Sequence, residues 1–188
     1  MYCASIGAVN RQGEVLTAVI YNPMLDEIVT ATKGGGCRVN GRKLNNDNKD
    51  IHLIPLQNSI INIGFPVSKP ETLAASSRAI SAFSTKVRGL RMFACASQVM
   101  AWVAQKKLNA YISWDLNSWD ICAGLLVVNE AGGFVSDFQG NRATVKTREM
   151  VILCQGAHEL AGDEKEGCIS MHREVLDILK DANCLNIY

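Results

Sequence analysis

One aspartate stands where its surroundings could make it reactive. Asp120 follows Trp119 and comes directly before a run of apolar residues that ends at Gly132 and Gly133. Because this run is apolar on every side, it predicts a short, buried helix, and the two glycines supply its end. Asp120 then lies in the first turn, where free N–H groups and the helix dipole favour a carboxylate, and where a phosphate or a metal–phosphate cluster can also bind. On spacing alone a helix cap is the commoner role, so both interpretations stay open.

Other reactive side chains give weaker signals. The seven cysteines include no Cys-x-x-Cys pair, which argues against a zinc site. Cys95 has no histidine nearby in a motif, so a packed thiol is favoured over a nucleophile. Cys95, Cys122 and Cys154 stand in apolar stretches and suit reduced thiols in a cytoplasmic core. The glycine-rich segment 33–36 lacks the strand-to-helix context of a phosphate-binding loop and predicts a turn. The histidines are expected at the surface or in loops: His52, His158 and His172.

Composition excludes several classes of protein. The 188 residues, 48% hydrophobic and 20% charged, suffice for a single soluble domain over 1–188. A net charge of +1 argues against a nucleic-acid surface or a basic membrane patch. The longest stretch without Asp, Glu, Lys or Arg, 51–68, contains prolines and polar residues, so no membrane span is expected. The beginning of the chain shows no charged-then-apolar signal layout.

Strand-like segments come first along the chain and then alternate with helical ones. Strands are predicted at 2–9, 14–21 and 27–32, and Asn40-Gly41 predicts a hairpin within 37–44, which together indicate an antiparallel meander. The later part alternates between buried strands, predicted at 59–65, 86–90, 108–113, 134–137 and 149–154, and helices, predicted at 70–83, 93–106, 119–131 and 171–180. This alternation indicates an α/β layered domain with a mixed sheet. Four of the strands should share one sheet: 59–65, 86–90, 108–113 and 149–154.

Two motifs carry a resemblance to a known family. Residues 119–133, WDICAGLLVVNEAGG, resemble the C-terminal signature of the inositol monophosphatase family, and residues 31–44, ATKGGGCRVNGRKL, resemble a structural hairpin of that family. The motifs occur in the family's order, and a looser resemblance extends over 5–157. The resemblance implies the layered α-β-α-β-α sugar-phosphatase fold, Mg²⁺-dependent hydrolysis of a small phosphorylated metabolite, and a homodimer.

The resemblance also implies roles for particular residues. Asp120 matches the aspartate that ligates catalytic magnesium and reaches the substrate. Cys95 and Ala96 match a loop whose backbone amides contact the substrate, although Cys95 replaces Ser or Thr there. Ser113 stands where many members carry a glutamate for the inositol ring, which weakens inositol as the substrate. Asp115 could replace that glutamate, with a solvated loop carboxylate as the favoured alternative. The segment 111–120 is similar to Gram-positive members, some of which hydrolyse NADP.

The family's other metal ligands have no counterpart in this sequence. They come from an upstream Glu and from an Asp-Pro-x-Asp-Gly-Thr motif, and no D-x-x-D-G occurs here. Because the family places this motif shortly before the strand with which the sequence begins, the chain resembles the C-terminal part of the enzyme, with the N-terminal helices missing. Two hypotheses follow: a Mg²⁺-dependent phosphatase of a sugar phosphate, an inositol phosphate or NADP, or a catalytically incomplete member that acts as a binding or partner module.

Overall fold

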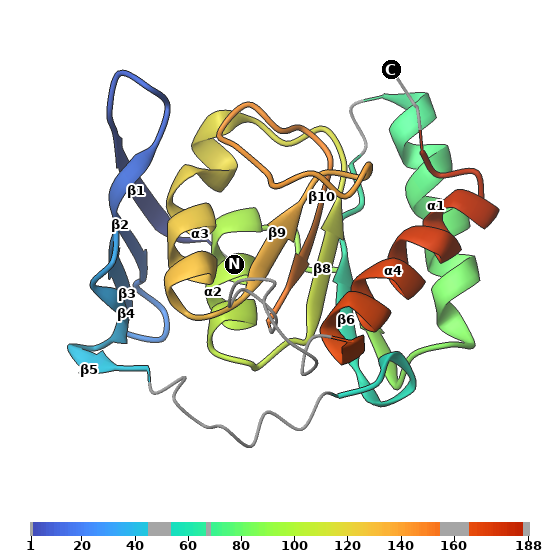
Figure 1. The fold of residues 1–188 in the computed structure, drawn as a ribbon, viewed down its shortest axis with the longest axis horizontal. Helices are drawn as coiled ribbons and strands as arrows, with labels where there is room; N and C mark the ends of the chain where they lie inside the picture. The colour runs from blue at the N-terminus through green and yellow to red at the C-terminus, as the bar shows by residue number, and fades with distance from the viewer. Residues whose placement is uncertain (1, 45–53, 67–68, 155–165, 186–188) are drawn as a thin grey trace.

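Four layers of secondary structure make up the fold. The computed structural model describes residues 2–44, 54–66, 69–154 and 166–185, with the side chains of 166–170 excepted. An antiparallel sheet, a pair of helices, a mixed sheet and a second pair of helices follow one another across the molecule (Figure 1). The predicted α/β layered fold with mixed sheets is confirmed. The outer helical layer of the five-layer family fold does not occur within the described ranges.

The first sheet is the predicted meander, with the strands in sequence order. Its strands are β1 (Ala4–Val9), β2 (Val15–Asn22), β3 (Glu27–Thr32), β4 (Gly36–Val39) and β5 (Arg42–Lys43). The last hairpin turns at Asn40 and Gly41, whose φ angles of 47° and 78° need residues that tolerate the left-handed region. Asn40 Oδ1 also accepts a hydrogen bond from the backbone N–H of Ile28 over 2.8 Å, which fastens this turn to β3.

The second sheet contains all four segments predicted to share one sheet. Its strands, in spatial order, are β7 (Gly89–Arg91), β6 (Ile60–Ile63), β8 (Ala110–Ser113), β10 (Met150–Leu153) and β9 (Phe134–Ser136). A 3₁₀ turn (Leu56–Asn58) leads into β6, which pairs in parallel with β7 and β8, whereas β10 is antiparallel to β8 and β9. β7 begins three residues later than predicted because the N–H of Lys86 donates to Phe83 O and so still closes the end of the preceding helix.

Helices cover both faces of the second sheet (Figure 1). α2 (Ala96–Ala104) and α3 (Ser118–Glu130) lie between the sheets, and α1 (Pro70–Ser84) and α4 (Glu166–Asp181) lie on the other side. α2 is shorter than the predicted 93–106. The N–H of Phe93 donates to Asn62 Oδ1 over 2.7 Å, which holds 93–95 as a loop beside β6 and leaves Ala94 exposed.

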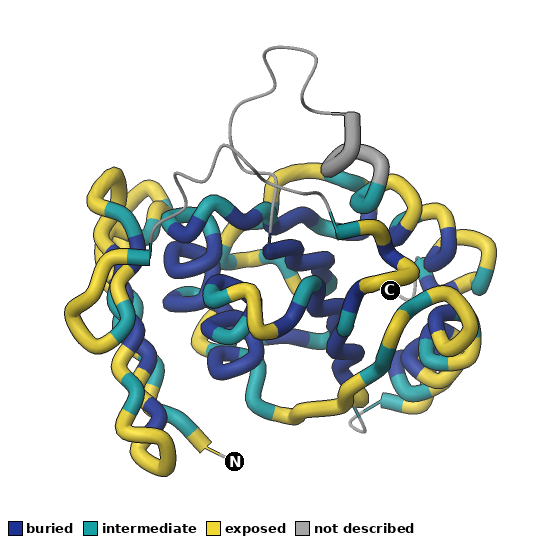
Figure 2. Tube along the Cα trace, turned by 90° about the horizontal axis from the view of Figure 1, so that it is seen from below, coloured by how far each residue is buried: buried dark blue, intermediate teal, exposed yellow. Residues whose placement is uncertain are grey.

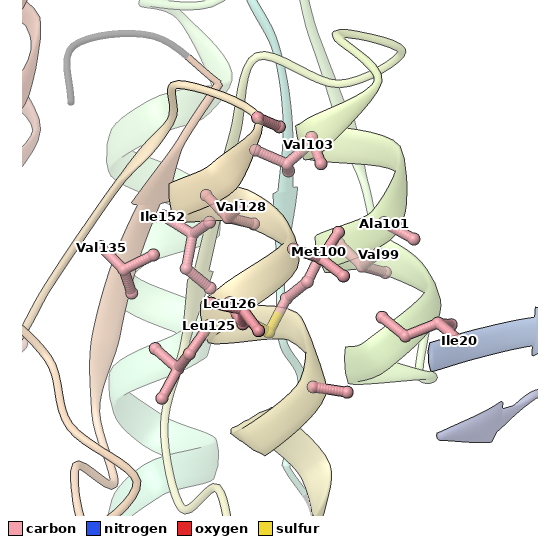
Figure 3. Packing of buried hydrophobic residues seen from close by; sticks show 14 of the residues in the cluster. Ile20, Val99, Met100, Ala101, Val103, Leu125, Leu126, Val128, Val135 and Ile152 are labelled. Carbon is pink, nitrogen blue, oxygen red and sulfur yellow. The ribbon is translucent and has the colours of Figure 1, made fainter. Parts of the chain in front are cut away.

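The core lies on both sides of the second sheet. Between the two sheets, Ile20 of β2 points toward α2, and Met100 of α2 packs beside Leu126 of α3 (Figure 3). Beyond the second sheet, Phe83 and Leu179 are fully buried between that sheet and the outer helices. The buried residues are concentrated in the interior, and exposed ones follow the first sheet and the outer helices (Figure 2).

α3 is the buried helix that the apolar run predicts. Seven of the eight residues from Ile121 to Val128 are buried, and the exception is Cys122. Gly132 ends the helix with a φ of 79°, as its position predicts. Gly124 lets α2 approach closely, because a Cβ at this position would lie 2.3 Å from Met100 Sδ. Within the described ranges, no helix has the length and apolar character needed to cross a membrane.

Candidate active site

Asp120 occupies the third position of α3, after the N-cap residue Asn117. The backbone N–H of Asn117 donates a hydrogen bond to Asp120 Oδ2 over 2.9 Å, the geometry of a capping box. Asp120 is half-buried, and within the described residues its other oxygen, Oδ1, has no hydrogen-bond partner. The carboxylate is thus oriented through one oxygen, while the second remains available to a ligand. Trp119 beside it is 74% exposed.

The N-termini of α2 and α3 meet at Asp120. Ser97, in the first turn of α2, donates its hydroxyl to the backbone carbonyl of Asp120 over 2.8 Å. Cys95 is the N-cap of α2 and Ala96 its first residue, so these two predicted site residues lie close to Asp120 in space. The partial positive charge at both helix N-termini therefore acts on one region, which is a favourable place for an anion.

The sequence does not single out Tyr111, which belongs to the same region. Burial raises the pKa of Tyr111 to about 12, the charges of Asp120 and Cys95 act in the same direction, and a hydrogen bond with Ser113 opposes them. Ser113 itself is 3% exposed, and a Cβ at Gly64 would lie 2.3 Å from its hydroxyl oxygen. Ser113 is therefore packed against the backbone of a neighbouring strand, behind the surface of the candidate site.

Asp115 is not the solvated carboxylate favoured from the sequence. Its side chain is 9% exposed, and its Oδ1 pairs with Lys69 Nζ at 3.0 Å and with Arg148 Nη2 at 2.6 Å. Asp115 also has a φ of 54°, which aspartate tolerates better than most residues. Arg148 Nη1 reaches Asn117 Oδ1 at 3.4 Å, so an ion-paired network extends from Asp115 to the N-cap of α3. The cations lie 46 and 33 positions away in the sequence, which explains why the pattern could not reveal them.

Glu149 adds a second acidic group near Asp115. Burial raises the pKa of Glu149 above its usual value, and the negative charge of Asp115 raises it further. Its Oε1 is buried and finds no hydrogen-bond partner within the described part of the chain. This carboxylate is therefore held in a place that disfavours its charged form.

The described side chains do not complete a magnesium site. No group of three or more His, Cys, Asp and Glu side chains is close enough there to hold a metal ion. Mg²⁺ needs several oxygen ligands, and the region around Asp120 offers the single free oxygen of that carboxylate. A working metal centre therefore requires carboxylates that the described residues do not bring to Asp120.

The structure also places the remaining candidate residues. His172 is not a surface residue: it is half-buried, its Nε2 lies 2.6 Å from Ser136 Oγ, and its ring packs edge-on against Phe134. His52 and His158 lie outside the described residues.

Among the predicted core thiols, Cys154 is buried, whereas Cys95 and Cys122 are only partly buried. Residues 33–35 form the predicted turn and Gly36 begins β4, and Glu130 accepts backbone hydrogen bonds from Gly34 and Gly36 there.

The fold is an α/β layered one with a carboxylate at the meeting of two helix N-termini, and comparison with known proteins identifies the family. The model of the inositol monophosphatase family matches residues 1–171. The chain is 34% identical over 142 residues to an inositol-1-monophosphatase of Mesorhizobium japonicum, covering 76% of this chain and 52% of that protein. It is also 34% identical over 139 residues to the Nus factor SuhB of Xylella fastidiosa, and the match covers 74% of this chain and 49% of that protein. The chain belongs to the inositol monophosphatase family.

Solved structures agree with this assignment. The inositol monophosphatase of Thermotoga maritima has a TM-score of 0.75 at 25% identity, covering 96% of this chain and 61% of that chain. The inositol monophosphatase from Anabaena shares the fold with a TM-score of 0.79 at 23% identity, and the match covers 99% of this chain and 69% of that chain. This chain spans about half the length of the two relatives named above. Membership supports the predicted enzyme class, phosphatase, by family.

Proposed function

We propose that this chain carries the aspartate-bearing part of the active site of a Mg²⁺-dependent phosphate monoesterase. The convergence of α2 and α3 at Asp120 supports this proposal most strongly. Ser97 links the two helix N-termini through the Asp120 carbonyl, and Oδ1 of Asp120 is left free. Helix N-termini attract an anionic phosphate, and a free carboxylate oxygen suits a hard cation. Family membership supplies the reaction class.

Each residue of the site has a role in this proposal. The backbone N–H groups of Cys95 and Ala96 bind the phosphate, and Asp120 contributes one ligand to Mg²⁺. Asp115 lies in the segment between β8 and α3, where its ion pairs with Lys69 and Arg148 hold its carboxylate in place for a substrate hydroxyl. Ser113, being buried, supports Tyr111 and the strand rather than reaching far into the site.

The substrate in this proposal is a small sugar or inositol phosphate, with NADP as the next candidate. Two relatives are named inositol-1-monophosphatase and inositol monophosphatase, from Mesorhizobium japonicum and Dictyostelium discoideum. The absence of a glutamate at position 113 favours a substrate other than inositol 1-phosphate. We place the protein in the cytoplasm as a homodimer, in keeping with its free thiols.

A second candidate function is that of a partner module without turnover. The incomplete metal site and the relatives named Nus factor SuhB favour this alternative. So does the outer face of the first sheet, where Ile6 is 68% exposed and Tyr21 is 36% exposed. Apolar side chains on an open sheet face are typical of a surface that another segment covers.

A chimeric enzyme tests the proposal. The portion of the Mesorhizobium relative that this chain does not cover is joined to this chain, and phosphate release is measured from inositol 1-phosphate, a sugar phosphate and NADP with and without Mg²⁺. We expect Mg²⁺-dependent release from the chimera and little from the 188-residue chain alone, because one carboxylate cannot assemble the site. A folded chimera that releases no phosphate from any of the three substrates would favour the partner module.

A further inference from the structure

Two cysteines from distant parts of the chain bring their thiols into contact. Cys3 precedes β1, the edge strand of the first sheet, and Cys95 is the N-cap of α2. Their Sγ atoms are 3.2 Å apart, although 92 positions separate the residues in the sequence. Both side chains are partly buried rather than enclosed, and both thiols are free. This contact is independent of the function proposed above.

The other thiols near this place have different surroundings. Cys122 of α3 faces β1, where a Cβ at Gly7 would lie 2.3 Å from its Sγ. Cys37 and Cys154 are buried. Cys3 and Cys95 are thus the pair that contact each other, and each belongs to a segment with room to adjust. Cys3 adjoins a strand with only one neighbour in its sheet, and Cys95 lies at the end of the exposed loop before α2.

We propose that Cys3 and Cys95 form a redox-sensitive pair that a small-molecule disulfide oxidises to an intramolecular disulfide. The sulfurs need to approach by about 1.2 Å to reach the bond length of a disulfide, roughly 2.0 Å. The bond would join the edge strand of the first sheet to the N-terminus of α2. Ser97, two residues further on, contacts Asp120, so oxidation would fix the backbone next to the candidate active site.

The reaction is a thiol–disulfide exchange in two displacements. One protein thiol loses its proton and attacks a sulfur of the small disulfide, which expels one small thiolate and leaves a mixed disulfide on the protein. The second protein thiol then loses its proton and attacks the protein sulfur of that mixed disulfide, which expels the second small thiolate. The protein pair loses two electrons and two protons, and the oxidant becomes two thiols.

The surroundings make this exchange dependent on pH. The pKa of Cys3 is raised to about 12, mainly because the thiol is partly buried and also because of the hydrogen bond and the charge of Cys95. A backbone hydrogen bond from Gln98 opposes this increase. Cys3 is therefore protonated at neutral pH, and because the thiolate is the attacking species, closure should be slow near pH 7 and faster in alkaline solution.

Mass mapping of the intact chain tests the proposal. Wild type, Cys3→Ser, Cys95→Ser and the matched control Cys122→Ser are equilibrated with oxidised and reduced glutathione, quenched with acid, alkylated and digested. We expect wild type and Cys122→Ser to yield a linked Cys3–Cys95 peptide that reduction removes, and its rate of formation to rise several-fold from pH 7 to pH 8. In the two single variants the linked peptide should be absent, with glutathione attached to the remaining cysteine of the pair.

Other outcomes would overturn the proposal. They are a link from Cys3 to Cys122, a link between two chains, or no Cys3–Cys95 peptide at the most oxidising ratio while the chain stays folded by circular dichroism. If a serine variant does not fold, the alanine variant at the same position, Cys3→Ala or Cys95→Ala, replaces it, and the linked peptide in the wild type decides the question without any variant.

Discussion

The backbone N–H of Asn117 donates a hydrogen bond to Oδ2 of Asp120 over 2.9 Å. The carboxylate is therefore oriented by the helix that it begins, and its second oxygen is left for a ligand. Capping and ligand binding are alternatives on the sequence alone, but this geometry allows both at once, one on each oxygen. The ion-paired network of Asp115, Lys69 and Arg148 adjoins this carboxylate at Asn117.

Arg148 is expected to stabilise the start of α3 through its contacts with Asp115 and Asn117. Arg148→Met removes both contacts and should lower the free energy of unfolding by only about 1 kcal/mol, since the Arg148 side chain is about half exposed. Arg148→Lys keeps the charge but not the planar fork, and should recover part of the loss. Urea unfolding at low and high salt measures this, and the loss should shrink at high salt. An Arg148→Met protein as stable as wild type at low salt would contradict the network.

Glu149→Gln should stabilise the protein at neutral pH. Burial and the charge of Asp115 raise the pKa of Glu149, so the folded state binds its proton more tightly than the unfolded state does. The charged carboxylate therefore costs stability at pH 7, and this cost disappears as pH falls through the folded pKa toward about 4.5. Thermal melts should show a higher melting temperature for Glu149→Gln at pH 7 and a smaller difference near pH 5. An equal advantage at both pH values would be inconsistent with a charge effect.

His172 should make stability fall in mildly acidic solution. Burial lowers the pKa of His172 below the usual value near 6.5, although the charge of Asp137 opposes the shift. The unfolded state therefore binds the proton more readily, and the stability present above about pH 6.5 is lost as pH falls below it. His172→Gln removes this dependence, so its difference from wild type should change between about pH 7.5 and 5.5. Parallel stability curves for the two proteins over that range would show that His172 does not titrate in this way.

Gly124→Ala should destabilise the packing of α2 on α3. Alanine in a helix gains up to about 1 kcal/mol over glycine, but overpacking costs about 1–3 kcal/mol. The new Cβ would lie 2.3 Å from Met100 Sδ and 2.9 Å from Met100 Cβ, and the Cβ atom cannot rotate away. We expect a net loss of about 1 kcal/mol in urea unfolding. In a Met100→Ala background the Sδ contact is absent while the Cβ contact remains, so the loss should become smaller; a loss of unchanged size there would place the clash elsewhere.

The architecture could be predicted from local patterns, but some boundaries could not. Apolar runs bounded by turn residues predicted the second sheet, and the double glycine predicted the end of α3. The start of α2 was wrong because the side chain of Asn62, 31 positions away, holds Phe93 as a loop. The start of β7 was wrong because Lys86 still belongs to the end of α1. Both errors come from hydrogen bonds that a local pattern does not contain.

In the candidate site too, features that local sequence patterns contain were predicted, whereas those that depend on distant contacts were not. Asp120 was predicted from its place before an apolar run, and the structure puts it in the first turn of that helix. Asp115 was misjudged because its two cations come from the loop before α1 and the loop before β10. Tyr111 was missed because an aromatic residue inside a buried strand is typical of the core, and its environment becomes apparent only when α2 and α3 are in place.

The most direct test of the central claim is a Mn²⁺ titration followed by NMR, with Mn²⁺ standing in for Mg²⁺. Paramagnetic broadening detects even weak binding, and Asp120→Asn removes the charge while keeping the shape. In wild type, the account predicts broadening centred on the amides of Asn117, Asp120 and Ala96 that excess Mg²⁺ reverses.

The same broadening should persist in the matched control Asp115→Asn and disappear in Asp120→Asn. The melting temperatures of wild type and Asp120→Asn should stay close, because the asparagine carbonyl oxygen can still accept the hydrogen bond from the Asn117 N–H, and the lost charge near the helix N-terminus is worth about 0.3–1 kcal/mol. Unchanged broadening around α3 in a folded Asp120→Asn protein would contradict the assignment of Asp120 as a metal ligand.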